Sequence, residues 1–193
     1  MATHIRTISA DDLALYSRVP IAFRVESVLQ VELVGGGLGG VLLREERVDA
    51  PYLKDYDAYE GGPERWPVAF DVRNWSFFLA MEGDRPIGGA TVAWNTAGVR
   101  MLAGRSDLAV LWDIRVRPDL RRRGVGTMLL RRAAGWSREH GCRQLKIETQ
   151  NVNVPACRFY AGQGCRLGAI DRYGYAGHPQ VGHEVMLIWH LHL

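Results

Sequence analysis

The sequence has few cysteines and no long hydrophobic run, and both absences narrow the class of protein. Its three cysteines, Cys142, Cys157 and Cys165, are too few and odd in number for a disulfide framework. We expect them to be small buried side chains in a reduced cytoplasm. No apolar run approaches the length of a membrane span, and the N-terminus lacks the basic-then-apolar pattern of a signal peptide. These features predict a cytoplasmic protein without a membrane partner.

The chain also lacks a strong excess of charge of one sign. Its 24 lysines and arginines against 21 aspartates and glutamates give a net charge of +3. This balance does not favour nucleic acid as a partner, because the arginines gather around one glycine-rich turn instead of an extended stripe. No repeat, low-complexity tract or linker divides the sequence, and its length suffices for one substantial core. We therefore predict a single domain spanning residues 1–193.

What the sequence does contain is a glycine-rich turn between a strand and a helix. Residues 109–116 read as a strand, a turn and three arginines follow, and Gly124-Val125-Gly126 opens a helix. Unpaired N–H groups at such a helix start, beside arginines, suit a diphosphate. The turn is not a P-loop, which needs a lysine after its last glycine, nor the G-x-G-x-x-G of dinucleotide folds. A solvated surface turn is the alternative.

Two motifs in this chain resemble those of the GNAT superfamily of N-acetyltransferases. Residues 121–126 match its R/Q-x-x-G-x-G/A, and residues 116–118 match the preceding V-x-P. Residues 153–160 resemble its second motif, N-x-x-A-x-x-F/L-Y, in the expected order and one helix–strand unit later. The resemblance implies transfer of an acetyl group from acetyl-CoA to an amine.

Hydrophobic periodicity and turn residues predict the remaining elements. We expect strands at residues 5–8, 23–34, 41–48, 75–81, 87–94, 109–116, 144–149, 167–173 and 184–192, and helices at 13–17, 124–140 and 155–163. Residues 35–40 read as a hairpin loop, residues 49–67 as an irregular connection, and His190 and His192 as the exposed face of the last strand. This order resembles the GNAT α/β fold, a mixed, mostly antiparallel sheet flanked by helices, whose central strands splay around acetyl-CoA.

The resemblance also assigns residues to acetyl-CoA. Backbone amides of Ile114 and Val116 would hold the pantetheine arm, and Asn153 would hydrogen-bond that arm or only cap its helix. Tyr160 matches the phenol that serves many members as general acid toward the thiolate. The ordinary pKa of a phenol, about 10, is reasonably matched to that of a thiol, about 8.5. Tyr160 could instead be a core aromatic beside Phe159. The pyrophosphate would be held by the turn residues Arg121, Arg122, Gly124, Val125, Gly126 and Thr127.

The base that deprotonates the amine has two candidates. They are Glu148, on the strand at 144–149, and Asp113, on the strand at 109–116. Both residues are expected to lie near the splay of the two strands. Either could accept the proton directly or through water, or bind a second ammonium of the substrate. Asp113 could equally pair with Arg115 or Arg117 as a structural contact. We rank Glu148 above Asp113.

The GNAT resemblance implies that the 49–67 segment, which is rich in acids and aromatic residues, lies over the acceptor side of the cleft. Clustered carboxylates attract a polycationic amine, and rings pack on its stem or sandwich its ammonium; a polar connecting loop is the alternative. We assign Tyr52, Asp55 and Trp112 to substrate binding.

One further resemblance narrows the substrate. Residues 148–175, together with 111–116 and 50–56, are similar to the streptothricin acetyltransferases, which acetylate an amine of the β-lysine arm of a cationic antibiotic. The acidic stretch is shorter than in some relatives, and Cys165 replaces the usual phenylalanine. We predict that the protein acetylates a small cationic amine by direct transfer in a ternary complex. Streptothricin-like compounds are the first candidates for this amine. The alternatives are an acetyltransferase for protein N-termini or lysines and a non-catalytic acyl-CoA-binding module. We assign no metal; a homodimer is common in the superfamily, but no stretch identifies an interface.

Overall fold

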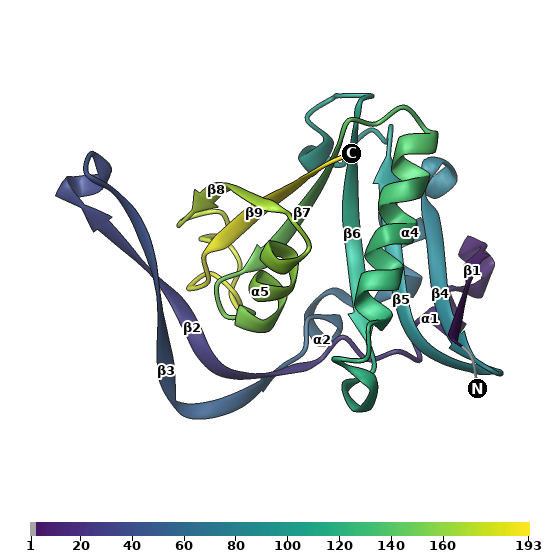
Figure 1. The fold of residues 1–193 in the computed structure, drawn as a ribbon, viewed down its shortest axis with the longest axis horizontal. Helices are drawn as coiled ribbons and strands as arrows, with labels where there is room; N and C mark the ends of the chain where they lie inside the picture. Colours follow the sequence, from purple (N-terminus) through teal and green to yellow (C-terminus); the bar gives the residue numbers. More distant parts are fainter. Residues whose placement is uncertain (1–2) are drawn as a thin grey trace. The chain divides into compact units, whose positions relative to one another are not determined.

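The structure of the protein, a computed structural model, describes residues 3–193 except for the side chain of Glu60 (Figure 1). The chain divides into two compact units. The first comprises Met1–Ala22, Asp55–Ile147 and His190–Leu193, and the second comprises Phe23–Lys54 and Glu148–Trp189. The expectation of one domain spanning residues 1–193 stays a prediction. Among residues 3–193, no helix is both long and apolar enough to cross a membrane.

The first unit is built on strands in the hydrogen-bonded order β1-β4-β5-β6-β7. The β1–β4, β4–β5 and β5–β6 pairs are antiparallel, whereas β6 and β7 are parallel. Its strands are β1 (Thr3–Ile8), β4 (Ser76–Glu82), β5 (Arg85–Trp94), β6 (Leu108–Val116) and β7 (Gln144–Gln150), the last of which continues into the second unit. Its helical segments are η1 (Ala10–Asp12), α1 (Leu13–Tyr16), α2 (Asp57–Glu60), η3 (Pro63–Arg65), α3 (Trp66–Ala69), η4 (Val72–Asn74), η5 (Arg100–Leu102), η6 (Pro118–Leu120) and α4 (Val125–Glu139).

Two adjacent glycines on β5 allow helices to pack closely on both faces of this sheet. A Cβ atom on Gly88 would lie 3.0 Å from the Leu129 and Val125 side chains of α4, and one on Gly89 would lie 2.5 Å from the Tyr16 ring of α1. Because neighbouring residues of a strand point to opposite faces, α4 and α1 cover opposite sides of β5. Figure 1 shows α4 lying along β5 and β6.

The α1 face of the sheet carries the aromatic part of the core. Tyr16 packs edge-on against Trp66, which stacks on Phe77, with ring centroids 5.6 Å and 6.3 Å apart. The helix predicted at 13–17 is present as α1 and is preceded by η1, whose start is fixed by Ser9 N donating to Asp12 Oδ2 at 3.3 Å. This packing fixes α1 beside β6, where the candidate site residues lie.

The second unit contains a long hairpin and a shorter strand pair. The hairpin joins β2 (Phe23–Val34) to β3 (Gly40–Lys54) through η2 (Gly35–Gly37), where positive φ angles suit the predicted glycine loop. The rest consists of α5 (Val154–Gly162), β8 (Arg166–Asp171) and β9 (Met186–His192) in the strand order β7-β9-β8. The last residues of β9 belong to the first unit. The predicted closing strands are therefore confirmed as neighbours.

Two sequence predictions need correction. The strand predicted at 41–48 extends to Lys54, because the ladder resumes beyond a bulge and pairs Val25 with Tyr52 and Phe23 with Lys54. The connection expected at 49–67 is therefore strand in its first part and contains α2, η3 and α3 in the rest. His192 is exposed as predicted, but His190 is half-buried.

The three cysteines are free and buried, as expected from the sequence. Burial raises the pKa of the Cys157 thiol to about 12 and that of Cys165 to about 11. Both thiols therefore stay protonated and unreactive near neutral pH.

Candidate active site

The turn between β6 and α4 has the backbone geometry of an anion-binding loop. Gly124 caps α4 with φ +84°, and Arg122 adopts φ +67°, which is uncommon for a residue with a side chain. The first helical hydrogen bond runs from Met128 N to Gly124 O at 3.0 Å. The N–H groups before it therefore have no partner within the helix, and the first turn of α4 contains no acidic residue. Such a turn fits a phosphate.

The three arginines of this turn are placed differently. The Arg121 guanidinium donates to Val116 O at 3.0 Å and to Ala22 O at 2.7 Å, so its side chain fastens the turn to the end of β6. Burial lowers the pKa of Arg121. Arg122 and Arg123 are exposed. Of these predicted cationic donors, Arg122 and Arg123 have side chains directed to solvent, whereas the side chain of Arg121 is used within the protein.

A bulge at Trp112 coincides with the end of pairing between β6 and β7. Thr91 pairs with Asp113 but Val92 pairs with Leu111, so Trp112 is the extra residue. The parallel pairs of β6 with β7 end at Leu111 and Ile147. In the described part of the chain, residues 112–116 of β6 therefore form no ladder pair with β7.

The free edge of this part of β6 carries the backbone groups of Ile114 and Val116. Arg117 N donates to Ile87 O at 3.0 Å, which makes Gly88 and Val116 a non-hydrogen-bonded pair of the antiparallel ladder. The N–H and C=O groups of Val116, and of Ile114 two residues earlier, therefore point away from β5. The Val116 carbonyl accepts from Arg121. The two N–H groups lie where an extended amide-containing chain could pair with β6.

Asp113 belongs to a buried network on the α1 face of the sheet. Its Oδ1 accepts from the Tyr16 hydroxyl at 2.6 Å and from Arg115 Nε at 2.9 Å, and its Oδ2 accepts from Arg115 Nη2 at 2.7 Å. The same guanidinium donates to both carboxylate oxygens of Asp57, at 2.6 Å and 3.1 Å, and to Val19 O at 3.2 Å. The pairing of Asp113 with Arg115, which was the alternative prediction for Asp113, is therefore present in the structure.

The pKa values of Arg115 and Tyr16 are both raised in this network. Burial opposes the charge of Arg115, but Asp113 and Asp57 outweigh burial and raise the pKa of Arg115. Burial, and then the charge of Asp113, hold the pKa of Tyr16 well above its usual value. The phenol therefore stays protonated and remains a donor to Asp113.

Glu148 lies in the second unit and is bonded to a tyrosine. The Tyr175 hydroxyl donates to Glu148 Oε1 at 2.6 Å and accepts from Gln150 Nε2 at 2.9 Å. Glu148 is half-buried, whereas Asp113 is 8% exposed. Each candidate base accepts a hydrogen bond from a tyrosine hydroxyl, and Asp113 also accepts from the Arg115 guanidinium.

Asn153 and Tyr160 lie at the two ends of one short helix. The Asn153 side chain caps α5 by accepting from Ala156 N at 3.2 Å, so the capping alternative is realised. Tyr160 is 5% exposed and packs against the rings of Phe159 and Trp189, with centroids 5.4 Å and 6.5 Å apart. The Tyr160 ring is therefore part of the core, as the alternative prediction stated. This packing does not decide the role of the Tyr160 hydroxyl.

The predicted substrate-binding residues fall in both units. Tyr52 lies on β3, where it pairs with Val25. Asp55 accepts from Asp57 N at 3.1 Å, just before α2. Trp112 packs against Trp75, with centroids 5.0 Å apart, and joins the aromatic core of the first unit.

Sequence reasoning missed Tyr16, Asp57 and Tyr175. Each contacts a candidate base or its partner from a segment far away in sequence. Asp57 lies in the acidic segment that drew attention to Asp55, and this proximity was the available signal. Tyr175 stands in the irregular segment between β8 and β9, whose sequence carries no periodic pattern.

Comparison with known proteins identifies the family. Residues 42–165 match the acetyltransferase (GNAT) family. The chain is 38% identical over 141 residues to a streptothricin acetyltransferase of Escherichia coli, covering 73% of this chain and 71% of that protein. It is 31% identical over 147 residues to streptothricin acetyltransferase A of Bacillus subtilis (strain 168), covering 76% of each.

A solved structure supports the same assignment. A candidate streptothricin acetyltransferase of Bacillus anthracis str. Ames, in complex with acetyl coenzyme A, matches this fold with a TM-score of 0.76 and 26% identity, covering 100% of both chains. The mixed sheet flanked by helices, predicted from the sequence, is thereby confirmed as the GNAT fold, and acetyl-CoA is the co-substrate. The chain belongs to the GNAT family of acetyltransferases and is an N-acetyltransferase similar to the streptothricin acetyltransferases.

Proposed function

We propose that this enzyme acetylates a small cationic amine by direct transfer in a ternary complex. The first candidate for this amine is a streptothricin-type antibiotic. The observation that carries the proposal is the half-buried Glu148 carboxylate, which is bonded to a neutral phenol in a chain similar to the streptothricin acetyltransferases. The carboxylate of Asp113 already accepts from the Tyr16 hydroxyl and from two nitrogens of the Arg115 guanidinium. These contacts support Glu148 over Asp113 as the proposed base.

In this proposal, each assigned residue takes part in one step of the reaction. Acetyl-CoA supplies the thioester carbonyl. The amine loses its proton to Glu148, its nitrogen bonds to the acetyl carbon, and the carbon–sulfur bond breaks. The N–H groups of Ile114 and Val116 hold the pantetheine arm and polarise the carbonyl. Tyr160 gives a proton to the leaving sulfur and regains one from the acylated nitrogen, and Glu148 passes the proton taken from the ammonium to solvent, so that charge and protons balance. The substrate-binding roles of Tyr52, Asp55 and Trp112 remain part of the proposal.

The N-terminal turn of α4 would hold the pyrophosphate of acetyl-CoA. We expect Arg122→Gln to weaken acetyl-CoA binding by about 5–10-fold, because it removes one exposed charge from an anion site. Calorimetric titration at low and high salt measures the loss, which should shrink as salt rises. Arg138→Gln, the same change in the last turn of α4, is the matched control and should leave the affinity unchanged. Equal affinities for Arg122→Gln and the unaltered enzyme would remove the Arg122 side chain from the site.

The proposed acid is tested by Tyr160→Phe. We expect kcat to fall by about 10²-fold, with the largest loss at high pH, because an unprotonated thiolate must then leave. Tyr173→Phe, on a tyrosine that is 73% exposed, is the control. An unchanged kcat in a folded Tyr160→Phe variant would leave only the packing role of that ring.

The substrate class is tested with a panel of acceptors. Thiol release from acetyl-CoA is measured with streptothricin, polyamines, aminoglycosides and lysine-bearing peptides. We expect the highest kcat/KM for streptothricin. Turnover of peptides alone would favour the protein-acetylating alternative. Acetyl-CoA binding without turnover of any acceptor would favour the non-catalytic alternative.

A further inference from the structure

The segment between β8 and β9 places one tyrosine on the candidate base. Tyr175 donates its hydroxyl proton to Glu148 Oε1 at 2.6 Å, and Gln150 Nε2 donates to the same hydroxyl at 2.9 Å. An amide nitrogen is a donor only, so the phenol must accept from Gln150 and direct its own proton toward Glu148. The chain of donors therefore runs from Gln150 through Tyr175 to the carboxylate.

The end of the same segment is fixed to the strand that carries Glu148. Asn151 N donates to Val185 O at 3.0 Å, and Val185 N donates to Asn151 Oδ1 at 2.8 Å. Glu184 forms an ion pair with Lys54, and both side chains are almost completely buried. These contacts anchor the segment that carries Tyr175. They join it to Asn151, directly after β7, and to Lys54, the last residue of β3.

The charges around Tyr175 keep its hydroxyl protonated. Burial raises the pKa of Tyr175, and the negative charge of Glu148 and, less strongly, of Glu184 raises it further. Lys54 pairs with Glu184 and so offsets part of that charge. A phenol that stays protonated throughout the working pH range acts as a constant donor to Glu148.

We infer that Tyr175 is a positioning residue for acetyl transfer, which orients the Glu148 carboxylate toward the amine and favours its ionised form. The inference rests on the proposed role of Glu148 as the base. The hydroxyl of Tyr175 donates to Oε1 of Glu148, and this contact restricts the orientation of the carboxylate.

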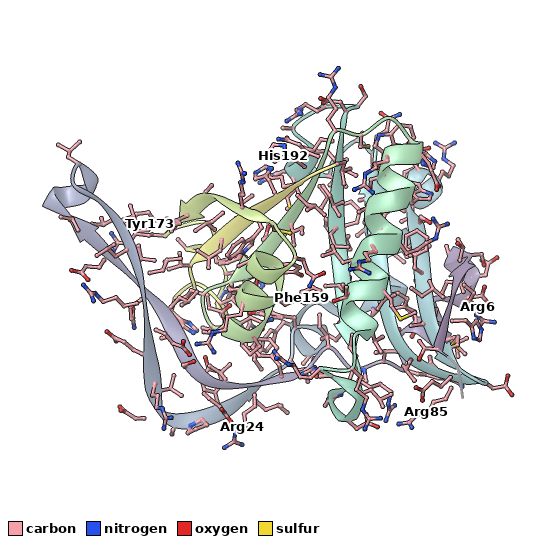
Figure 2. All side chains as sticks on the ribbon, viewed as in Figure 1. Arg6, Arg24, Arg85, Phe159, Tyr173 and His192 are labelled. Carbon is pink, nitrogen blue, oxygen red and sulfur yellow. The ribbon has the colours of Figure 1, made fainter. Side chains whose placement is uncertain are left out.

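Tyr175→Phe tests the inference because it keeps the ring and removes only the hydroxyl. We expect kcat/KM for the amine at neutral pH to fall by about 10-fold. The acidic limb of the pH profile should move up by about one to two pH units, because a hydrogen bond to the charged carboxylate is lost. Acetyl-CoA affinity, measured by calorimetry, should stay unchanged. Tyr173→Phe, on the exposed neighbouring tyrosine just after β8 (Figure 2), is the matched control and should leave the profile unchanged.

A second variant guards against loss of folding. Gln150→Leu leaves Tyr175 in place but removes the donor that orients its hydroxyl, and it should move the acidic limb in the same direction by a smaller amount. Thermal unfolding of each variant establishes that it is folded. An unmoved acidic limb in either folded variant overturns the inference while Glu148→Gln still abolishes transfer. If Glu148→Gln itself has no effect, the proposed base fails instead.

Discussion

Replacing Glu148 with glutamine is expected to lower kcat by about 10²–10⁴-fold at neutral pH. The amide has the size of the carboxylate but cannot accept the proton of the amine, and general-base catalysis contributes a factor of this order. Steady-state kinetics with streptothricin measures the loss. The KM for acetyl-CoA should change little, because the effect concerns the amine.

Two further variants make the Glu148 result specific. Glu139→Gln is the same chemical change at an exposed position of α4 and should leave kcat unaltered. Asp113→Asn weakens the pairing with Arg115 and should lower stability more than it lowers kcat in the folded protein. Full activity of Glu148→Gln, together with loss of activity in a folded Asp113→Asn variant, would transfer the role of base to Asp113.

The second large effect concerns stability. Arg115→Met should lower the free energy of unfolding by about 3–5 kcal/mol, because it leaves the buried Asp113 carboxylate without its cation. The same change removes the donors to Asp57 and to Val19 O. Urea unfolding followed by tryptophan fluorescence measures the loss, since Trp66, Trp75 and Trp112 lie in the aromatic core of this unit.

Arg117→Met provides the matched comparison. Arg117 is two residues further along the chain and pairs with Asp119, with side chains 30% and 51% exposed. Exposed pairs contribute about 0–1 kcal/mol, so this variant should unfold near the midpoint of the unaltered protein. Equal losses for the two variants would mean that the buried network does not stabilise the fold as described.

Local sequence patterns were sufficient for much of this fold. The β2 bounds, Phe23–Val34, match the predicted alternation, and the start of α4 lies next to the predicted Gly124. Both depend on neighbouring residues: a period of two in a strand and a glycine with φ +84° before a helix. The same local chemistry predicts an anion site at the turn of residues 121–126, and this assignment stays a prediction.

The remaining features depend on contacts between distant segments. Sequence motifs could identify Arg121 as a candidate. They could not show that its guanidinium donates to Ala22 O, 99 residues earlier. Tyr175 meets Glu148 across 27 residues of chain. The extension of β3 to Lys54 depends on pairing with Phe23, so the composition of residues 49–54 alone suggested a loop. Periodicity and motifs describe one segment at a time and carry no information on such pairs.

The most direct test of the proposed function is the mass spectrum of streptothricin after incubation with the enzyme and acetyl-CoA. We predict a product that has gained one acetyl group, with fragmentation placing it on an amine of the β-lysine arm. The Glu148→Gln variant should give only traces of this product under the same conditions. Unmodified streptothricin, in a reaction where the same enzyme acetylates a lysine-bearing peptide, would contradict the proposed function.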